Sequence, residues 1–181
     1  MKRIKLHDKE FELSIPYSEI AKAIEEVALQ ITEDLKNEHN PVFLCILNGS
    51  FMFASCLLQH INFNCEISFI KMASYKGTSS TGTVNEIIGL DTIIEGRTIV
   101  VIEDIVDTGN TLEKLVGILK ERHPKELKIA TLLYKPDAYK KDIKIDYIGK
   151  SIPNDFIVGF GLDYDKLGRN YTDIYSLKTD E

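Results

Sequence analysis

The sequence predicts an α/β fold with a central, mostly parallel sheet flanked by helices. Two short apolar runs, residues 42–47 and 99–102, carry this prediction, because continuous hydrophobicity is typical of strands buried on both faces. Each run is followed by a polar turn that contains glycine and then by apolar residues at helical spacing. Strands that alternate with helices form parallel sheets through right-handed crossovers.

The remaining elements follow from periodicity and turn residues. Ser18 is a candidate N-cap for a first helix, which Asn40-Pro41 ends. A Gly/Ser/Thr-rich stretch, 73–83, is expected to be a mobile loop. The other expected elements are a helix reaching about residue 60, strands at 65–72, 84–90 and 127–133, a helix that stops before Pro124, and short strands and turns after Tyr147.

The bulk properties indicate a single domain over residues 1–181 with no repeat or linker. A net charge of −6 argues against a general binder of nucleic acid or anionic membranes. No stretch resembles a membrane span or a signal peptide. Three cysteines lie in apolar stretches, which fits buried free thiols in a reducing cytoplasm: Cys45, Cys56 and Cys65. We therefore expect a cytoplasmic protein.

Residues 98–112, TIVVIEDIVDTGNTL, form the most informative pattern. Glu103 and Asp104 end the apolar run, and a polar turn then runs from Asp107 through Gly109 into a helix. Backbone N–H groups of such a turn can converge on an anion, and the helix N-terminus adds its positive dipole end. Three carboxylates beside an anion need other partners, such as a divalent metal, ribose hydroxyls or a transferable proton. Neither the Walker lysine nor the dinucleotide glycine pattern is present.

A loop whose polar residues merely cap a helix is the simpler interpretation of this pattern. The positions of other polar segments favour a ligand site instead. Residues 48–50, 104–111 and the tail of 127–135 all follow predicted strands, where α/β sheets bind their ligands. The 73–83 loop is placed to close over them.

With its acids included, the 98–112 pattern resembles the phosphoribosyl-pyrophosphate (PRPP) binding motif of type I phosphoribosyltransferases. From about residue 42 to 171 the chain is similar to the hypoxanthine and hypoxanthine–guanine members of that family. LNGS at 47–50 resembles their pyrophosphate loop, and Ser74-Tyr75 opens a segment like their flexible catalytic loop. Lys135 and the DFIVGFGLDY segment at 155–164 resemble their purine-binding elements.

The resemblance implies purine salvage. Such an enzyme transfers ribose 5-phosphate from PRPP to N9 of hypoxanthine, and of guanine as well, and releases pyrophosphate. It also implies Mg²⁺ as cofactor, a small hood built from the N-terminal segment and about 150–181, and a homo-oligomer, either a dimer or a tetramer.

The resemblance also assigns roles to individual residues. The catalytic residues are Asp107, which exchanges a proton with N7 of the purine, and Ser74 and Tyr75 of the closing loop. PRPP is bound by Glu103, Asp104, Thr108, Gly109, Asn110 and Thr111. Pyrophosphate is bound by Asn48, Gly49, Ser50 and Arg169, and the purine by Lys135, Phe156 and Ile157. The metal ligands are Glu103, Asp104 and Asp163.

Simpler roles exist for several of these residues. Asp107 suits an N-cap, Phe156 suits core packing, and Lys135 suits a solvated strand end. The family often has a basic residue where this chain has Asn48, and it has a non-proline cis bond where this chain has Leu47–Asn48, whose isomer the sequence leaves open. Two other functions also stay open: the same fold acting on xanthine, adenine or another base, and a non-catalytic PRPP sensor.

Overall fold

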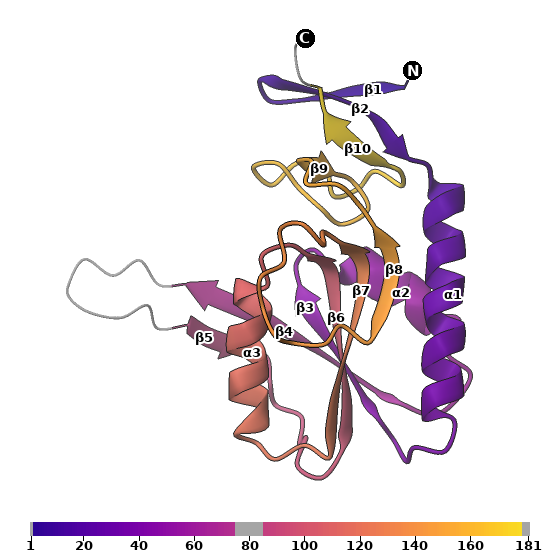
Figure 1. Cartoon of the computed structure of the whole chain (residues 1–181), viewed down its shortest axis with the longest axis vertical. Coiled ribbons are helices and arrows are strands. Elements are labelled where there is room, and N and C mark those ends of the chain that lie inside the picture. Colours follow the sequence, from indigo (N-terminus) through magenta and orange to yellow (C-terminus); the bar gives the residue numbers. More distant parts are fainter. Residues whose placement is uncertain (1, 75–84, 179–181) are drawn as a thin grey trace, which may run out of the picture.

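The computed structural model describes residues 2–74 and 85–178, without the side chains of 73–88, and these residues form two sheets (Figure 1). The larger sheet has the strand order β5-β4-β3-β6-β7-β8, in which only β5 is antiparallel to its neighbour. The predicted mostly parallel sheet is therefore confirmed. Its strands are β3 (Val42–Leu47), β4 (Glu66–Ser74), β5 (Asn85–Ile88), β6 (Thr98–Val106), β7 (Glu126–Tyr134) and β8 (Tyr147–Ser151).

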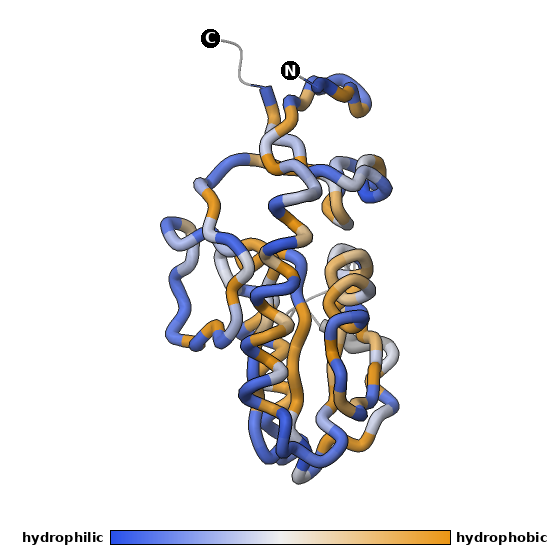
Figure 2. The backbone as a smooth tube through the Cα atoms, turned by 90° about the vertical axis from the view of Figure 1, so that its right-hand side faces the viewer, coloured by the Kyte–Doolittle hydropathy of each residue, from blue (hydrophilic) through white to orange (hydrophobic). Residues whose placement is uncertain are grey.

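Helices cover both faces of this sheet, as its apolar strands require. Side chains alternate along β3, so Phe43 and Cys45 pack towards α1 (Tyr17–Leu35) and α2 (Phe51–Leu58), while Leu44 packs in the core beneath α3 (Asn110–Lys120). In Figure 2 the turns of α1 alternate between hydrophilic and hydrophobic colours, as expected for a helix that buries one side.

The smaller sheet is the predicted hood, and it joins the two ends of the chain. Its order is β1-β2-β10-β9, all antiparallel, and it has its own core around Phe11 and Tyr175. It lies beyond the carboxyl ends of the parallel strands (Figure 1). That hood and sheet make a single domain stays a prediction. The hood strands are β1 (Arg3–Leu6), β2 (Lys9–Ile15), β9 (Ile157–Val158) and β10 (Ile174–Leu177).

The start of α1 differs from the prediction. The helix begins at Tyr17, Pro16 is its N-cap residue, and no side-chain cap is formed, so the predicted Ser18 cap is wrong. The acceptor comes from the hood instead: the Tyr17 N–H donates to Asp173 Oδ1 at 2.9 Å. Lys2 Nζ donates to the other oxygen of Asp173 at 2.7 Å. The N-terminus of α1 is thus capped by a residue far away in sequence and not by a neighbouring side chain.

Strand β6 is longer than its apolar run. It continues to Val106 because it pairs with β7 as far as Tyr134, so Glu103 and Asp104 lie within the strand. All three cysteines are free thiols, but only Cys45 is buried, and Cys56 and Cys65 are partly exposed.

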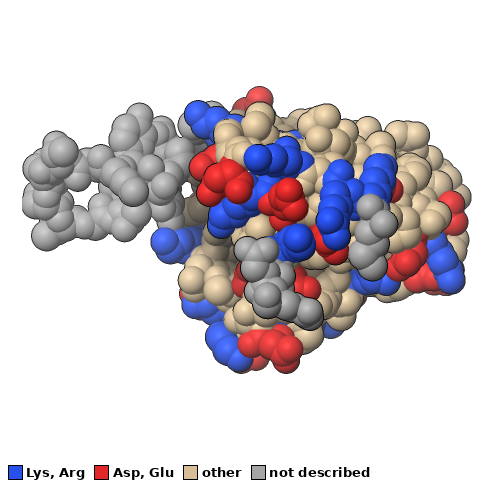
Figure 3. Space-filling model, turned by 90° about the horizontal axis from the view of Figure 1, so that it is seen from above, with Lys and Arg blue, Asp and Glu red and all other residues tan. Residues whose placement is uncertain are grey.

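The surface carries both charge signs. At the hood end, lysines and arginines lie beside aspartates and glutamates (Figure 3). Among the described residues no helix combines the length and apolar character that crossing a membrane requires.

Candidate active site

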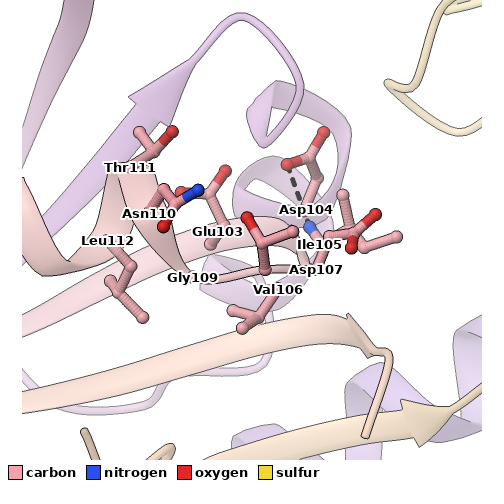
Figure 4. Close-up of a pocket in the computed structure, with 10 residues that line it drawn as sticks. Glu103, Asp104, Ile105, Val106, Asp107, Gly109, Asn110, Thr111 and Leu112 are labelled. Atoms are coloured by element: carbon pink, nitrogen blue, oxygen red, sulfur yellow. Dashed lines mark hydrogen bonds between the residues drawn. The ribbon is translucent and has the colours of Figure 1, made fainter. Parts of the chain in front are cut away.

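One cavity brings the central motif together. It has a volume of about 160 Å³ and is lined by residues 103–112, from the end of β6 through the turn to the start of α3. Asp104 and Asp107 lie at one end of this group, and Asn110 and Thr111 lie at the other (Figure 4). The expected PRPP-binding side chains therefore share one site.

Gly109 determines how the turn enters α3. It is the N-cap residue with a φ of 80°, in the left-handed region that favours glycine. A Cβ there would lie 2.5 Å from Tyr139 Cε2 and 2.9 Å from Lys141 Cγ, so space also demands glycine. No side chain caps the helix, so the capping role for Asp107 is wrong. The first N–H groups of α3 need other partners, and a phosphate is a suitable one.

Glu103 and Asp104 form a carboxylate pair with little access to water. Burial and the charge of Asp104 raise the pKa of Glu103 well above its usual value. Asp104 is 7% exposed, and burial raises its pKa, although the Ile105 N–H donates to Oδ1 at 2.9 Å. Two neighbouring acids whose charges are poorly solvated are suited to bind a hard cation or hydroxyl donors.

The loop after β3 packs directly on Asp104. A Cβ at Gly49 would collide with the Asp104 carboxylate, so only glycine fits this arrangement. The Leu47–Asn48 bond is cis, and Asn48 is exposed. Ser50 is buried, and both its N–H and its hydroxyl donate to the Ile46 carbonyl, at 3.3 and 2.6 Å. Of the three predicted pyrophosphate residues in this loop, Asn48 and Gly49 thus remain open to a ligand.

A turn from the hood packs on the same loop. A Cβ at Gly161, whose φ is 98°, would collide with the Gly49 carbonyl. Arg169 Nη1 donates to the Gly161 carbonyl at 2.6 Å, and Nη2 lies 2.5 Å from Asp163 Oδ1. Arg169, predicted to bind pyrophosphate, and Asp163, predicted to bind metal, therefore form an ion pair with each other. Among the described residues no three His, Cys, Asp or Glu side chains gather into a metal site. The metal-binding role of Asp163 stays a prediction.

The predicted purine residues are partly brought together. Lys135 is 7% exposed, and its Nζ donates to Asp107 Oδ2 at 3.1 Å. The interpretation of Lys135 as a solvated residue is wrong, because its side chain is buried. A buried ammonium needs a hydrogen-bond partner, and Asp107 provides it. Phe156 is 45% exposed and packs against Phe11 and Tyr164 of the hood. Ile157 is buried in β9.

The predicted catalytic loop lies mostly outside the described residues. Tyr75 and the stretch to 84 are not described, and Ser74 is described only as the last residue of β4. Their roles stay predictions.

Three residues near the site were missed by the sequence reasoning: Gly161, Tyr139 and Lys141. Their importance comes from contacts with Gly49 and Gly109, far away in sequence. In the sequence, a glycine can indicate a close approach of another segment, but it does not indicate which segment approaches it.

Comparison with known proteins now defines the class. The family model described as "Phosphoribosyl transferase domain" matches residues 16–165. The chain belongs to the phosphoribosyltransferase family. It is 44% identical to the hypoxanthine-guanine phosphoribosyltransferase of Streptococcus pyogenes serotype M3, over 91% of this chain and 92% of that one. It is 40% identical to the same enzyme of Bacillus subtilis, over 95% of each chain. A crystal structure of that enzyme from Bacillus anthracis matches with a TM-score of 0.81 and 37% identity, covering 92% of this chain and 97% of that one.

Gly49→Ala tests the contact between the pyrophosphate loop and β6. The added methyl group must displace the Asp104 carboxylate or the loop, and misplacements of about 1 Å can cost about 10²-fold in rate. We expect turnover with PRPP to fall by about that factor, while circular dichroism shows a folded protein. Gly117→Ala is the matched control, because nothing lies within 4 Å of its added Cβ. This change should keep activity and stabilise α3 by about 0.5–1 kcal/mol. Normal turnover in Gly49→Ala would contradict the prediction.

Proposed function

We propose that this protein is a purine-salvage enzyme that transfers ribose 5-phosphate from PRPP to N9 of hypoxanthine and guanine and releases pyrophosphate. The observation that carries the proposal is the Lys135–Asp107 pair at 3.1 Å, at the start of the phosphate-binding turn. O6 and N7 are neighbours on one edge of a 6-oxopurine. An ammonium and a carboxylate side by side offer a donor to O6 and an acceptor to an N7 proton.

Asp107 suits the proton transfer that this reaction needs. For N9 to attack with its lone pair, the imidazole proton of the base must be on N7. The N9–C1′ bond forms, the bond from C1′ to the pyrophosphate oxygen breaks with its electron pair, and the N7 proton passes to Asp107. The side chain of Asp107 is 46% exposed and thus accessible to the base.

The other end of the cavity suits PRPP. The N–H groups at the start of α3 and the exposed Thr108, Asn110 and Thr111 would hold the 5′-phosphate. Glu103 and Asp104 would hold Mg²⁺ or the ribose hydroxyls, and the metal would neutralise charge on the pyrophosphate. Mg²⁺ commonly takes one or two carboxylates together with substrate phosphates, which fits a site without a third protein ligand.

The other assignments rest on the family resemblance. Phe156 would stack on the purine, and Ile157 would offer backbone groups to its edge. Asn48 and Gly49 would bind pyrophosphate, and Arg169 and Asp163 would have to exchange their mutual contact for the ligand. Ser74 and Tyr75 would belong to the closing loop.

A panel of bases tests the function. PRPP, Mg²⁺ and each of hypoxanthine, guanine, xanthine and adenine are supplied in turn, and pyrophosphate release is measured. Turnover with hypoxanthine and guanine is expected, with little for adenine. A chelator should abolish turnover and weaken PRPP binding in calorimetry. PRPP binding without turnover of any base would instead favour the sensor, and a dominant xanthine or adenine activity would change the substrate.

Asp107→Asn removes the proton acceptor and keeps the shape. Turnover should fall by about 10²–10⁴, with PRPP affinity largely retained. Asp142→Asn is the control, because it makes the same change at an exposed position beyond the site. Single-turnover kinetics and PRPP calorimetry measure the two effects. Near-normal turnover in Asp107→Asn would reject the role.

Lys135→Met removes the ammonium and keeps an apolar stem in a buried position. A site built around one polar contact can reject an analogue without the partner by about 10⁴–10⁵. The ratio of kcat/KM for hypoxanthine to that for adenine should therefore fall by about 10²-fold or more. Exposed Lys140→Met should leave the ratio unchanged. An unchanged ratio in Lys135→Met would remove this residue from base selection.

We also propose that the protein is a cytoplasmic homo-oligomer whose copies meet at α2 and β4. No Asp, Glu, Lys or Arg occurs from Pro41 to Cys65. Ile67 and Phe69 lie on the sheet face that α2 covers, yet they are 47% and 45% exposed, and Phe51 at the start of α2 is 42% exposed. Lys71 lies on the same face of β4 and is exposed, so the apolar surface ends at this residue. A two-fold axis brings like residues together, so the apolar surface formed by α2, Ile67 and Phe69 suits a second copy of the chain.

Phe69→Glu would place like charges against each other at such an interface. Light scattering after gel filtration should give a multiple of the chain mass for the wild type and a smaller mass for the variant. Leu29→Glu, on α1 at a residue that is 70% exposed, should assemble like the wild type. A monomeric wild type, or an unchanged mass for Phe69→Glu, would exclude this interface.

A further inference from the structure

An ion pair lies beside the phosphate-binding end of α3 and is not explained by the roles above. Lys141 Nζ lies 2.7 Å from Glu113 Oε2. Glu113 is in the first turn of α3, and its N–H donates to the Gly109 carbonyl at 2.9 Å. The pair therefore lies one helical turn from the residue at which the phosphate loop becomes helix.

Glu113 presents a problem for phosphate binding. An acid in the first turn stabilises a helix through the dipole, but it repels an anion that approaches the same N-terminus. PRPP would bring its 5′-phosphate to this turn. Without compensation, the Glu113 carboxylate would weaken binding of this group.

The fold holds Lys141 in place against this carboxylate. Its Cγ would lie 2.9 Å from a Cβ at Gly109, so its stem packs on the loop itself, and its side chain is 21% exposed. Tyr139 fixes the segment from the other side: its ring also packs on Gly109, and its hydroxyl donates to the Ile143 carbonyl at 2.7 Å. A lysine with a packed stem loses less freedom when it forms an ion pair than a fully exposed one.

We propose that Lys141 is a positioning residue for the 5′-phosphate subsite, which neutralises Glu113 so that the N-terminus of α3 accepts a phosphate group. The inference rests on the proposed function and adds a residue that acts through Glu113 and Gly109 without touching the base. Its effect is confined to PRPP and the nucleotide product, because the purine binds at the Lys135 end of the loop.

A double-mutant cycle separates this role from simple packing. In Lys141→Gln, Glu113 is left uncompensated, and PRPP affinity should fall about two- to fivefold at low salt, the size expected for charges several ångströms apart in a solvated site. In Glu113→Gln the repelling charge is removed, and PRPP affinity should rise by a similar factor. The double variant should return close to the wild type.

The measurements are PRPP calorimetry with Mg²⁺ and the KM values of PRPP and hypoxanthine, at about 0.05 and 0.5 M salt. The KM of hypoxanthine should stay unchanged, and the effects on PRPP should shrink at high salt. Lys140→Gln is the matched control, because this exposed neighbour contacts the Asp137 carbonyl and not Glu113. It should change PRPP affinity less than Lys141→Gln does.

Weaker PRPP binding in both single variants would indicate a structural ion pair and overturn the proposal. An equal loss in Lys140→Gln would indicate a general effect of charge and would also overturn it. These outcomes require an active wild type, so a wild type without turnover of any purine would reject the proposed function instead.

Discussion

Two loops and the end of β6 meet in this protein at positions where no added side chain fits, and the geometry of the site depends on that meeting. The carboxylate of Asp104 occupies the space beside Gly49, and the carbonyl of Gly49 occupies the space beside Gly161. The loop after β3 thereby packs on a side chain of β6 and, backbone against backbone, on the turn of the hood. Arg169 supports the contact between Gly49 and Gly161 by donating to the Gly161 carbonyl. A ligand that contacts all three segments would therefore bind to groups whose positions are already determined by packing.

The end of the cavity at the start of α3, where we propose that phosphate binds, depends on electrostatics more than on packing. An acidic chain has to bind a strongly anionic substrate, yet Glu103, Asp104 and Asp107 line the cavity and Glu113 lies in the first turn of α3. Each of these carboxylates either forms an ion pair or is at least partly removed from solvent, which reduces its repulsion of a bound anion. Asp107 pairs with Lys135 and Glu113 pairs with Lys141, whereas Asp104 is buried and Glu103 is partly buried. In the proposed function, the N–H groups at the start of α3 would then be the main attraction for phosphate.

The sequence predicted what depends on neighbours along the chain. Continuous apolar runs gave the strands of the parallel sheet, and the acids, glycine and hydroxyls of 98–112 gave one end of the site. It could not predict what depends on distant contacts. Asp173 accepts the N–H of Tyr17 at the start of α1, and pairing with β7 extends β6. The side chains of Tyr139 and Lys141 fill the space beside Gly109. For Lys135 the sequence left a purine-binding role and a solvated strand end both open, and only the fold shows that it is buried against Asp107.

The hood has a consequence for how the molecule folds. Its central pair joins β2, near the beginning of the sequence, to β10, near its end, whereas the strands of the large sheet pair with partners much closer along the chain. Closing so long a loop is entropically costly until other parts are in place. During synthesis the parallel sheet can therefore assemble while β2 still lacks β10. The hood turn that reaches Gly49 is set only once β10 has been made and paired, so a nascent chain contains residues 107–112 before it contains the arrangement of all three segments.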